Sequence, residues 1–354
     1  PTNNKAAQPA LAYGGGQYML TWSRTAGGGN ADIFVQRVQP SGAVVGAATK
    51  VDTAVGKHGN PAIAYSSATD QFLVAWQDKT NSPVVRTQLI NADATLAGAS
   101  LAVSTTASGG DWPALCYDAT HDQFGILWTD TRTGTPQIFG MGIGPTNTPS
   151  TSAGTIQASA NAQGSPALAF SPTGTDYAVA WEETVAGIQK VRAQIEYGTG
   201  FLVQPAFYVD TTTGATQTKP AWGYDPVSGD FLLAWADSSG TPGIRAQRVK
   251  FSGVTAGPVI PVETAAGANA SPRLAYEPWQ GKFVVAWQDN RAGGGTWDVY
   301  GQFMGIDGVP WGGNFPIAPN VGAGGVADLA VDPVTPHGLA AIEASGAVIG
   351  QLIR

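Results

Sequence analysis

The stretch PRLAYEPWQGKFVVAWQDNRAGGGTWDVYGQ, residues 272–302, contains three short apolar runs separated by a tight turn and a glycine-rich loop. The first two runs, PRLAY and FVVAW, are joined by residues 277–282, whose Pro and Gly favour a hairpin turn. The third run begins at VYGQ, after the loop. Short apolar runs with turn residues between them predict antiparallel β-strands.

The same landmarks recur along the whole chain. A Pro lies in the first run of six copies, a Trp closes the second run, and a Gln stands in the third run of most copies. Successive Trp residues are 52–54 positions apart, and Ile342 takes the same place 55 residues after the last of them. The Trp residues are Trp22, Trp76, Trp128, Trp181, Trp235 and Trp287. Seven copies result, at approximately residues 8–58, 59–109, 110–163, 164–217, 218–269, 270–324 and 325–354.

Each complete copy also holds a looser fourth run, such as FYVDT or VIPVET. Four short strands per unit of about 50 residues are typical of a β-propeller blade. We therefore predict an all-β chain that forms one domain, residues 1–354, as a seven-bladed β-propeller of four-stranded antiparallel blades. The Trp-containing strand should lie in the middle of each blade, with the six Trp residues packed between blades. The seventh copy ends after its third strand, so the last blade is three-stranded, is closed by the N-terminus, or continues in residues upstream of Pro1.

The composition narrows the choice of partners. The chain of 354 residues has 47 Gly, 24 Pro and a formal net charge of −7. An acidic chain is poorly suited to nucleic acid or to anionic lipid, and no run of 18 apolar residues occurs. We expect no nucleic-acid partner and no membrane insertion. Sparse Lys with abundant Gly, Thr, Ser and Asn suits a secreted or surface-displayed protein.

The repeat itself resembles a known family. The pattern in residues 272–302 is similar to the repeats of bacterial secreted and cell-surface β-propeller proteins, and it extends over all seven copies. The resemblance implies an extracellular binding or scaffold module and brings no catalytic residue with it. The sialidase box Ser-x-Asp-x-Gly-x-Thr-Trp is missing apart from the end of GGGTWD at residues 293–298.

A repeated acidic residue follows each Trp by two positions in five copies. It is found at Asp78, Asp130, Glu183, Asp237 and Asp289. One interpretation is an acidic ring for a cation, a sugar or a basic partner. The other, which we favour, is a turn in which the carboxylate accepts backbone N–H bonds.

Residues outside the repeat are the better functional candidates, because the ring does not require them. Trp112 and Trp297 are expected in loops on one face, beside Asp289, Arg291, Arg132 and His58. Aromatic and charged side chains together can stack on sugars or anchor a protein. Each Trp could equally cover its own blade.

The sequence carries no recognisable catalytic or metal motif. The three His residues lie in different copies, Cys116 fills a small inner-strand position, and no calcium-loop spacing occurs. We expect no cofactor and no catalysis, and interpret the chain as a binding or scaffold module for a protein or glycan. Two alternatives are a lectin or glycan-active enzyme using the loop face, and a structural subunit that assembles through the last blade.

Overall fold

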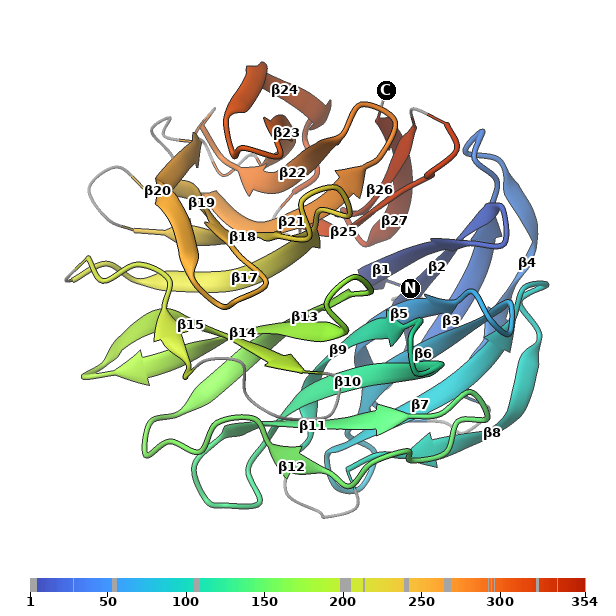
Figure 1. Cartoon of the computed structure of the whole chain (residues 1–354). Helices are drawn as coiled ribbons and strands as arrows, with labels where there is room; N and C mark the ends of the chain where they lie inside the picture. The colour runs from blue at the N-terminus through green and yellow to red at the C-terminus, as the bar shows by residue number, and fades with distance from the viewer. Residues whose placement is uncertain are drawn as a thin grey trace.

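The computed structural model describes residues 5–353, apart from 28, 53–55, 105–108, 198–204, 213, 239–241, 264–268, 292, 294, 296, 323–324 and 336. Seven antiparallel sheets are arranged in a ring, so the predicted seven-bladed β-propeller is confirmed (Figure 1). Among the described residues no helix has the length and apolarity needed to cross a membrane.

Six blades have four strands and the seventh has three. Blades one to three are β1 (Ala6–Gly14), β2 (Gln17–Gly27), β3 (Asn30–Val38), β4 (Val44–Lys50); β5 (His58–Ser66), β6 (Gln71–Asp78), β7 (Val84–Asn91), β8 (Leu96–Ala102); and β9 (Asp111–Asp118), β10 (Gln123–Asp130), β11 (Gln137–Ile143), β12 (Gly154–Thr155). Blades four and five are β13 (Gln163–Ser171), β14 (Asp176–Val185), β15 (Ile188–Tyr197), β16 (Phe207–Tyr208); and β17 (Gln217–Tyr224), β18 (Phe231–Asp237), β19 (Gly243–Val249), β20 (Thr255–Glu263). Blades six and seven are β21 (Asn269–Glu277), β22 (Lys282–Asp289), β23 (Asp298–Gly305), β24 (Pro310–Ala318); and β25 (Gly325–Val331), β26 (Gly338–Ala344), β27 (Ala347–Ile353).

The strand order within a blade follows the chain. The first strand of each blade lies nearest the central axis and later strands lie progressively further out (Figure 1). The Trp-containing strand is therefore the second from the axis, with a neighbour on each side, as the sequence predicts. Strands β6, β10, β18 and β22 are buried along nearly their whole length.

Apolar clusters between neighbouring blades hold the ring together. The described residues form seven such clusters, one at each blade boundary. Five of the six repeated Trp side chains are fully buried in them. Burying one Trp removes about 150–250 Å² from water and contributes on the order of 4–6 kcal/mol as an upper bound. Trp22 is the exception, because it is only half-buried and stacks on Phe34.

In blades one, two, five and six the repeated Gln side chain attaches the fourth strand to the third. Gln302 Nε2 donates to the carbonyl of Trp311 in β24 at 3.0 Å, and Gln88 Nε2 donates to the carbonyl of Ala97 in β8 at 2.9 Å. From the sequence we expect this Gln to bond to a backbone group of a neighbouring loop. In the structure its partner is the fourth strand of its own blade. Each of these bonds spans a bulge in the ladder, where ordinary strand pairing is interrupted.

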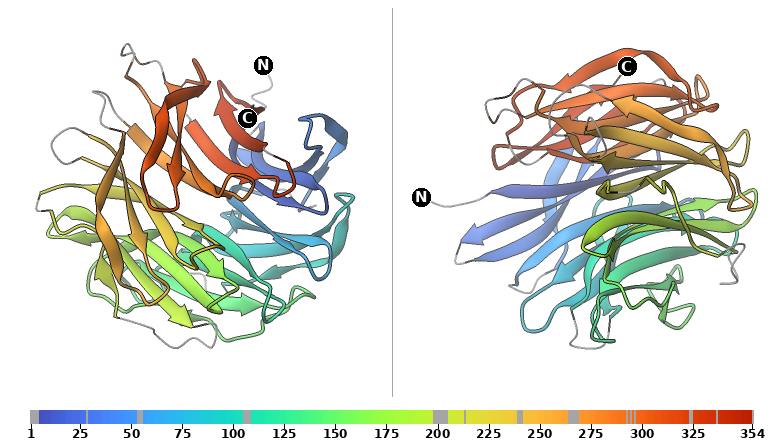
Figure 2. Two further views of the ribbon diagram at one scale, coloured as in Figure 1. Left: turned by 45° about the horizontal axis from the view of Figure 1, so that its top comes forward. Right: turned by 90° about the vertical axis from the view of Figure 1, so that its left-hand side faces the viewer.

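Blade seven closes the ring without a shared sheet. Blade seven (red) lies beside blade one (blue) in Figure 2, and the two are joined by hydrogen bonds. The N–H of Ala6 donates to the carbonyl of Gly346 at 2.8 Å, and the hydroxyl of Tyr18 donates to the carbonyl of His337 at 3.2 Å. The apolar cluster at this boundary includes Tyr18 and Leu339.

Candidate functional site

Each of six inner strands contains a bulge at the residue before the repeated proline. These six residues have positive φ angles of 48–54°, in the left-handed region that residues other than glycine rarely adopt. They are Gln8, Asn60, Trp112, Ser165, Lys219 and Ser271. The bulge is common to the blades while the side chain differs, so the backbone presents a ring of varied groups at one end of the channel.

This ring surrounds a cavity in the part of the chain that the structure describes. The cavity has a volume of about 430 Å³ and lies at the mouth of the central channel. It is lined by residues from the first strands of all seven blades and by Glu343 of β26. Its volume lies in the range of small-molecule sites, which is about 300–1,000 Å³. We call it the channel mouth.

The part of the channel mouth built by blades one to four is neutral and polar. Gln8 Nε2 donates to Asn60 Oδ1 at 2.5 Å, and the N–H of Asn60 donates back to Gln8 Oε1 at 2.9 Å. Asn60 Nδ2 in turn donates to Asp111 at 2.7 Å. Trp112 stands next in the ring, with 45% of its surface exposed. The result is a preorganised amide pair beside an accessible indole.

The part built by blades five to seven is charged. It contains Lys219, Arg273, Asp328 and Glu343. Lys219 Nζ lies 4.4 Å from the centre of the Trp112 ring and donates to Ser165 Oγ at 3.1 Å. Glu343 accepts the N–H of Gln8 at 3.1 Å. All four ionisable residues therefore belong to one side of the mouth.

Arg273 and Asp328 interrupt the repeat at one position. The residue after the repeated proline is Ala in blades one to five, Arg273 in blade six, and Asp328 in the matching position of blade seven. The two lie in adjacent inner strands and line the same cavity. This position holds alanine in five blades and a charged residue in two, so it breaks the symmetry of the ring. A catalytic or specific binding site requires such an asymmetric set of groups.

The environment of Asp328 favours its protonated form. Burial raises the pKa of Asp328, against the opposing influence of the Arg273 charge and of two backbone donors. Those donors are the N–H groups of Leu11 at 2.8 Å and Leu329 at 2.9 Å. The first of these bonds also joins blade seven to blade one. Asp328 thus combines a ring-closing contact with a carboxyl group whose proton is held more tightly than usual.

Of the six residues predicted from the sequence, the structure places Trp112 at the channel mouth. It lies at the bulge of β9 rather than in a loop. Arg132, Asp289, Arg291 and Trp297 lie at the same end of their blades, but none of them lines the cavity. His58 is buried, with its Nε2 3.5 Å from Asp78 Oδ1.

Asp289 and Arg291 form a hydrogen-bonded ion pair inside blade six. Arg291 Nε donates to Asp289 Oδ2 at 2.9 Å, and the guanidinium lies 3.9 Å from the centre of the Tyr300 ring. The indole N–H of Trp287 also donates to Asp289, at 3.1 Å. Burial would raise the pKa of Asp289, but these hydrogen bonds outweigh it and hold the pKa below its ordinary value. The carboxylate is fully buried, as expected for a structural group.

The same unit recurs in blade three. Arg132 bonds to Asp130 at 2.6 Å and lies 4.4 Å from the centre of the Phe139 ring, while Trp128 donates to Asp130 at 2.9 Å. All five repeated acids are buried. This geometry supports the structural interpretation of the acidic residue over an acidic ring open to a ligand.

Trp297 belongs to the boundary between blades six and seven. Its side chain is partly buried against the apolar cluster there, and its carbonyl accepts the N–H of Val321 at 2.8 Å. Three residues of the loop that precedes it, 292, 294 and 296, lie outside the described residues.

Five residues of the channel mouth were not predicted from the sequence, namely Gln8, Asn60, Lys219, Arg273 and Asp328. A signal was present, because these residues differ between blades while they lie directly before or after the position of the repeated proline. What the sequence does not reveal is the bulge, since a left-handed residue before proline has no sequence signature of its own.

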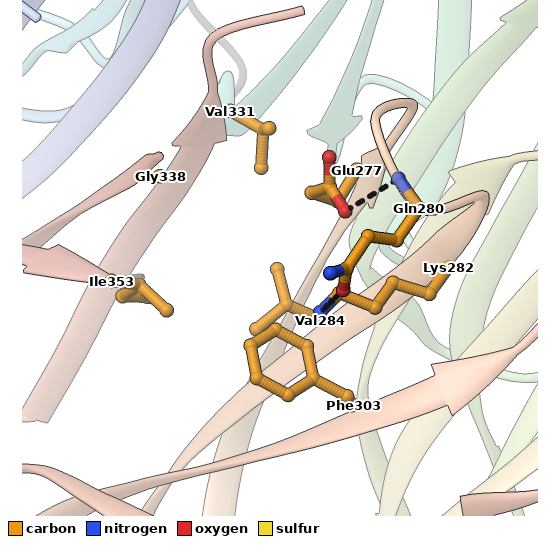
Figure 3. Close-up of a pocket in the computed structure, with 8 residues that line it drawn as sticks. All are labelled: Glu277, Gln280, Lys282, Val284, Phe303, Val331, Gly338 and Ile353. Atoms are coloured by element: carbon orange, nitrogen blue, oxygen red, sulfur yellow. Dashed lines mark hydrogen bonds between the residues drawn. The ribbon is translucent and has the colours of Figure 1, made fainter. Parts of the chain in front are cut away.

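A second cavity lies between blades six and seven, at the opposite end of the blades (Figure 3). It has a volume of about 140 Å³ and is walled by Val284, Phe303, Val331 and Ile353. Its polar groups pair with one another, as Glu277 accepts the N–H of Gln280 at 3.0 Å and the ammonium of Lys282 donates to the side chain of Gln280. It is too small for a sugar ring with its hydroxyl groups.

The cavity between blades six and seven has a simple origin in the sequence. Val331 occupies the place that holds Tyr or Phe in the other six blades. Those aromatic residues are Tyr13, Tyr65, Tyr117, Phe170, Tyr224 and Tyr276. A smaller side chain at one boundary leaves space that the surrounding strands do not fill.

No group of three or more metal-ligating side chains occurs within the described ranges. Burial raises the pKa of the Cys116 thiol, so this cysteine is poorly suited to act as a nucleophile.

Comparison with known proteins supports the fold. No protein-family model matches the chain, and no curated protein matches its sequence. Among solved structures, a polysaccharide lyase described as an ulvan lyase is similar with a TM-score of 0.66 and 8% identity, over 99% of this chain and 93% of that one. The β-propeller domain of the Trilobed protease from Pyrococcus furiosus, which has an open velcro topology, gives a TM-score of 0.56 and 8% identity, over 98% and 94%. A Hadza microbial sialidase gives 0.56 and 12% identity, over 92% and 73%.

At these identities the likeness establishes the propeller fold alone. It nevertheless overturns the expectation that a chain of this kind carries no catalysis. Two of the structures described above are named as a polysaccharide lyase and a sialidase, and the likeness covers 99% and 92% of this chain. The absence of a familiar motif is therefore no argument against enzymatic activity on this fold.

Proposed function

We propose that this protein is a carbohydrate-active β-propeller that holds a glycan at the channel mouth and hydrolyses it there. The observation that carries the proposal is the division of this cavity of about 430 Å³ into a neutral side with an exposed indole and a charged side with two carboxylates. Neither side alone would support the same conclusion.

The neutral side has the groups that recognise a sugar. The face of an indole packs against the C–H surface of a pyranose, and its burial by a ligand is favourable. The amides of Gln8 and Asn60 and the hydroxyl of Ser165 can exchange hydrogen bonds with sugar hydroxyls, since each carries both donors and acceptors. The Gln8–Asn60 bonds hold the amides in place before a ligand arrives, which lowers the entropy lost on binding.

The charged side has the groups that hydrolysis requires. Glycoside hydrolysis uses one carboxyl group as an acid and a second carboxylate as a base or nucleophile. Asp328, whose pKa is raised by burial, is suited to the first role, and Glu343 to the second. Lys219 and Arg273 would favour a glycan with carboxylate or sulfate groups.

Two further lines of support come from outside the site. The ulvan lyase and the sialidase, which share the fold, are named for activity on glycans. A glycan substrate also fits the extracellular location and the likeness to bacterial surface propellers that the composition and the repeat suggest. The extracellular location and the likeness to bacterial surface propellers are themselves part of the proposal.

The test is a panel of neutral and uronic-acid polysaccharides. Binding is measured by calorimetry, new reducing ends report hydrolysis, and absorbance of unsaturated products reports elimination. Trp112→Ala should weaken binding at least about tenfold, as the loss of one stacking aromatic does. Trp279→Ala is the matched control, because Trp279 is 62% exposed in the hairpin at the other end of blade six.

Glu343→Gln separates binding from reaction. It should retain most of the affinity and lose hydrolysis about 10²-fold or more, since the amide cannot act as a base. Binding without turnover by the unaltered protein would reject the catalytic part of the proposal. Equal binding by Trp112→Ala and the unaltered protein would reject the channel mouth as the site.

A further inference from the structure

Lys219 differs from the other residues at the bulges of the channel mouth. Of the six bulge residues it alone carries a charge, and its backbone has a φ of 54°. It is partly buried and lines the cavity, although the chain as a whole has a net charge of −7. The bulge is common to six blades, so the charged side chain needs an explanation of its own.

The ammonium group of Lys219 has few partners inside the protein. Its Nζ donates to Ser165 Oγ at 3.1 Å and lies 4.4 Å from the centre of the Trp112 ring. No carboxylate of the described residues forms an ion pair with it. An ammonium group has three N–H donors, and one hydroxyl oxygen with one aromatic face leaves donor capacity for a ligand.

Other partly buried cations of this protein are matched by its own carboxylates. Each of blades two to six has an arginine in an ion pair of this kind, namely Arg86, Arg132, Arg192, Arg248 and Arg291. In the cavity itself, the charge of Arg273 acts on Asp328 and opposes the rise of its pKa by burial. Lys219 is therefore the cation of the cavity that has no anion of its own, and removing a charge from water is costly without one.

Glu182 of the preceding blade fixes the bulge that carries Lys219. Its Oε1 accepts the backbone N–H of Lys219 at 2.8 Å, and its Oε2 accepts Gln189 Nε2 at 3.0 Å. It is buried and does not line the cavity. Glu343 occupies the equivalent position in blade seven and accepts the N–H of Gln8 in the same way, at 3.1 Å. Glu182 thus holds the main chain of Lys219 and not its ammonium group.

We propose that the glycan held at the channel mouth is anionic, that the ammonium group of Lys219 binds its carboxylate or sulfate group, and that Glu182 is the positioning residue for Lys219. This inference rests on the proposed function and names the substrate class. An ammonium group forms charge-assisted hydrogen bonds with either anion. The hydroxyl of Ser165 accepts from Lys219 and keeps its own proton to donate to the same group.

The probes are polygalacturonate, alginate and carrageenan, each compared with a form from which the charged groups have been removed by carboxyl reduction or desulfation. Calorimetry on the full chain should show at least one anionic polysaccharide binding about tenfold or more tightly than its neutral counterpart, as expected for a charge-assisted bond. Whether a polyuronate or carrageenan shows the difference distinguishes carboxylate from sulfate.

Lys219→Met removes the charge and keeps most of the side-chain volume. It should bind the preferred anionic polysaccharide at least about tenfold more weakly and the neutral counterpart with unchanged affinity. Lys250→Met is the matched control, because Lys250 is exposed between β19 and β20, at the other end of blade five. Equal weakening by the two variants would overturn the proposal, since net charge and not the channel mouth would then hold the anion.

Two variants of Glu182 test the positioning role. Glu182→Ala loses the acceptor for the N–H of Lys219 and should bind the anionic polysaccharide about fivefold more weakly, with the neutral counterpart unaffected. Glu182→Gln keeps a carbonyl acceptor and should restore the binding. Equal losses for the anionic and neutral forms, or no rescue by glutamine, would reject the positioning role.

The results also separate this inference from the proposed function. If the neutral forms bind as tightly as the anionic ones, or none of the three anionic polysaccharides binds, the anionic preference is wrong. The proposed function survives that result when the chain still binds a neutral glycan and loses it in Trp112→Ala. If the chain binds no glycan, both proposals fail.

Discussion

Blades six and seven share one backbone plan and differ at almost every landmark of the repeat. Blade six has Tyr276, Trp287 and Asp289 where blade seven has Val331, Ile342 and Ala344. Blade six also has its fourth strand, whereas blade seven ends at β27 among the described residues. The comparison shows that the ring still forms when one of its seven blades lacks the repeated Tyr, Trp and Asp.

Blade seven, which departs most from the repeat, also supplies the carboxylates of the channel mouth. Asp328 and Glu343 both belong to it, and blade six contributes Arg273 beside them. The complete blades provide the repeated packing, and the divergent end of the ring provides the charged side chains of the cavity. This division is expected when one asymmetric site must be built on a symmetric scaffold.

The largest expected effect comes from removing the packing unit of blade six. Trp287→Ala should lower the free energy of unfolding by about 4 kcal/mol, because it empties a fully buried site between blades. Ile342→Ala, at the matching place in blade seven, should cost about 3 kcal/mol, since less surface and volume are lost. Chemical denaturation measures both.

The exposed Trp279 again provides a control. Trp279→Ala should change stability by less than about 0.5 kcal/mol. If Ile342→Ala costs as much as Trp287→Ala or more, the view of blade seven as the less tightly packed member of the pair is incorrect.

The next effect concerns the acid that blade seven lacks. Asp289→Asn should lower the stability by about 3 kcal/mol at neutral pH, because it removes the charge that Arg291 and Trp287 are arranged around. The pKa of Asp289 is lower in the folded protein than its ordinary value. Its contribution is therefore fully present above the unfolded pKa of about 4 and is lost as the pH falls through the folded pKa.

Stability curves from pH 7 to pH 3 check this sign. The difference between the unaltered protein and Asp289→Asn should shrink on acidification, while Asp307→Asn, in an exposed turn, should follow the unaltered protein throughout. A difference of constant size at every pH would show that the aspartate acts through its shape and not through its charge.

The fold could be predicted because the landmarks of the repeat are local and frequent. A Trp that closes an apolar run every 52–54 residues can be counted in the sequence, and its burial follows from the strand pattern. The partner of the repeated Gln could not be found in this way. It depends on a bulge that shifts the register between the third and fourth strands, and the sequence shows only an ordinary Gly near the expected position.

The candidate site was less accessible from the sequence for a related reason. In the sequence, charged and aromatic residues in loops are the best candidates, which favours Arg291 and Trp297. In the structure Arg291 packs on Tyr300, and Trp297 packs against the apolar cluster between blades six and seven. Residues of the channel mouth come from the first strands of all seven blades and from β26, which are spread along the whole sequence. Only closure of the ring brings Trp112 and Asp328 to one cavity, so their proximity is a property of the topology.

The smallest effect is a gain, obtained by restoring a landmark of blade six to blade seven. Val331→Tyr should fill the cavity of about 140 Å³ between the two blades and raise the stability by about 1 kcal/mol. The ring of Tyr276 packs on Phe283 with centroids 5.3 Å apart, and its hydroxyl bonds to Asp225 of the preceding blade. By the same register the introduced hydroxyl would meet Glu277.

Val331→Phe fills the space without the hydroxyl, so thermal denaturation of the two variants separates packing from hydrogen bonding. Destabilisation by both would mean that the cavity walls cannot move to admit a ring, and the two blades would then differ in backbone position as well as in side chains.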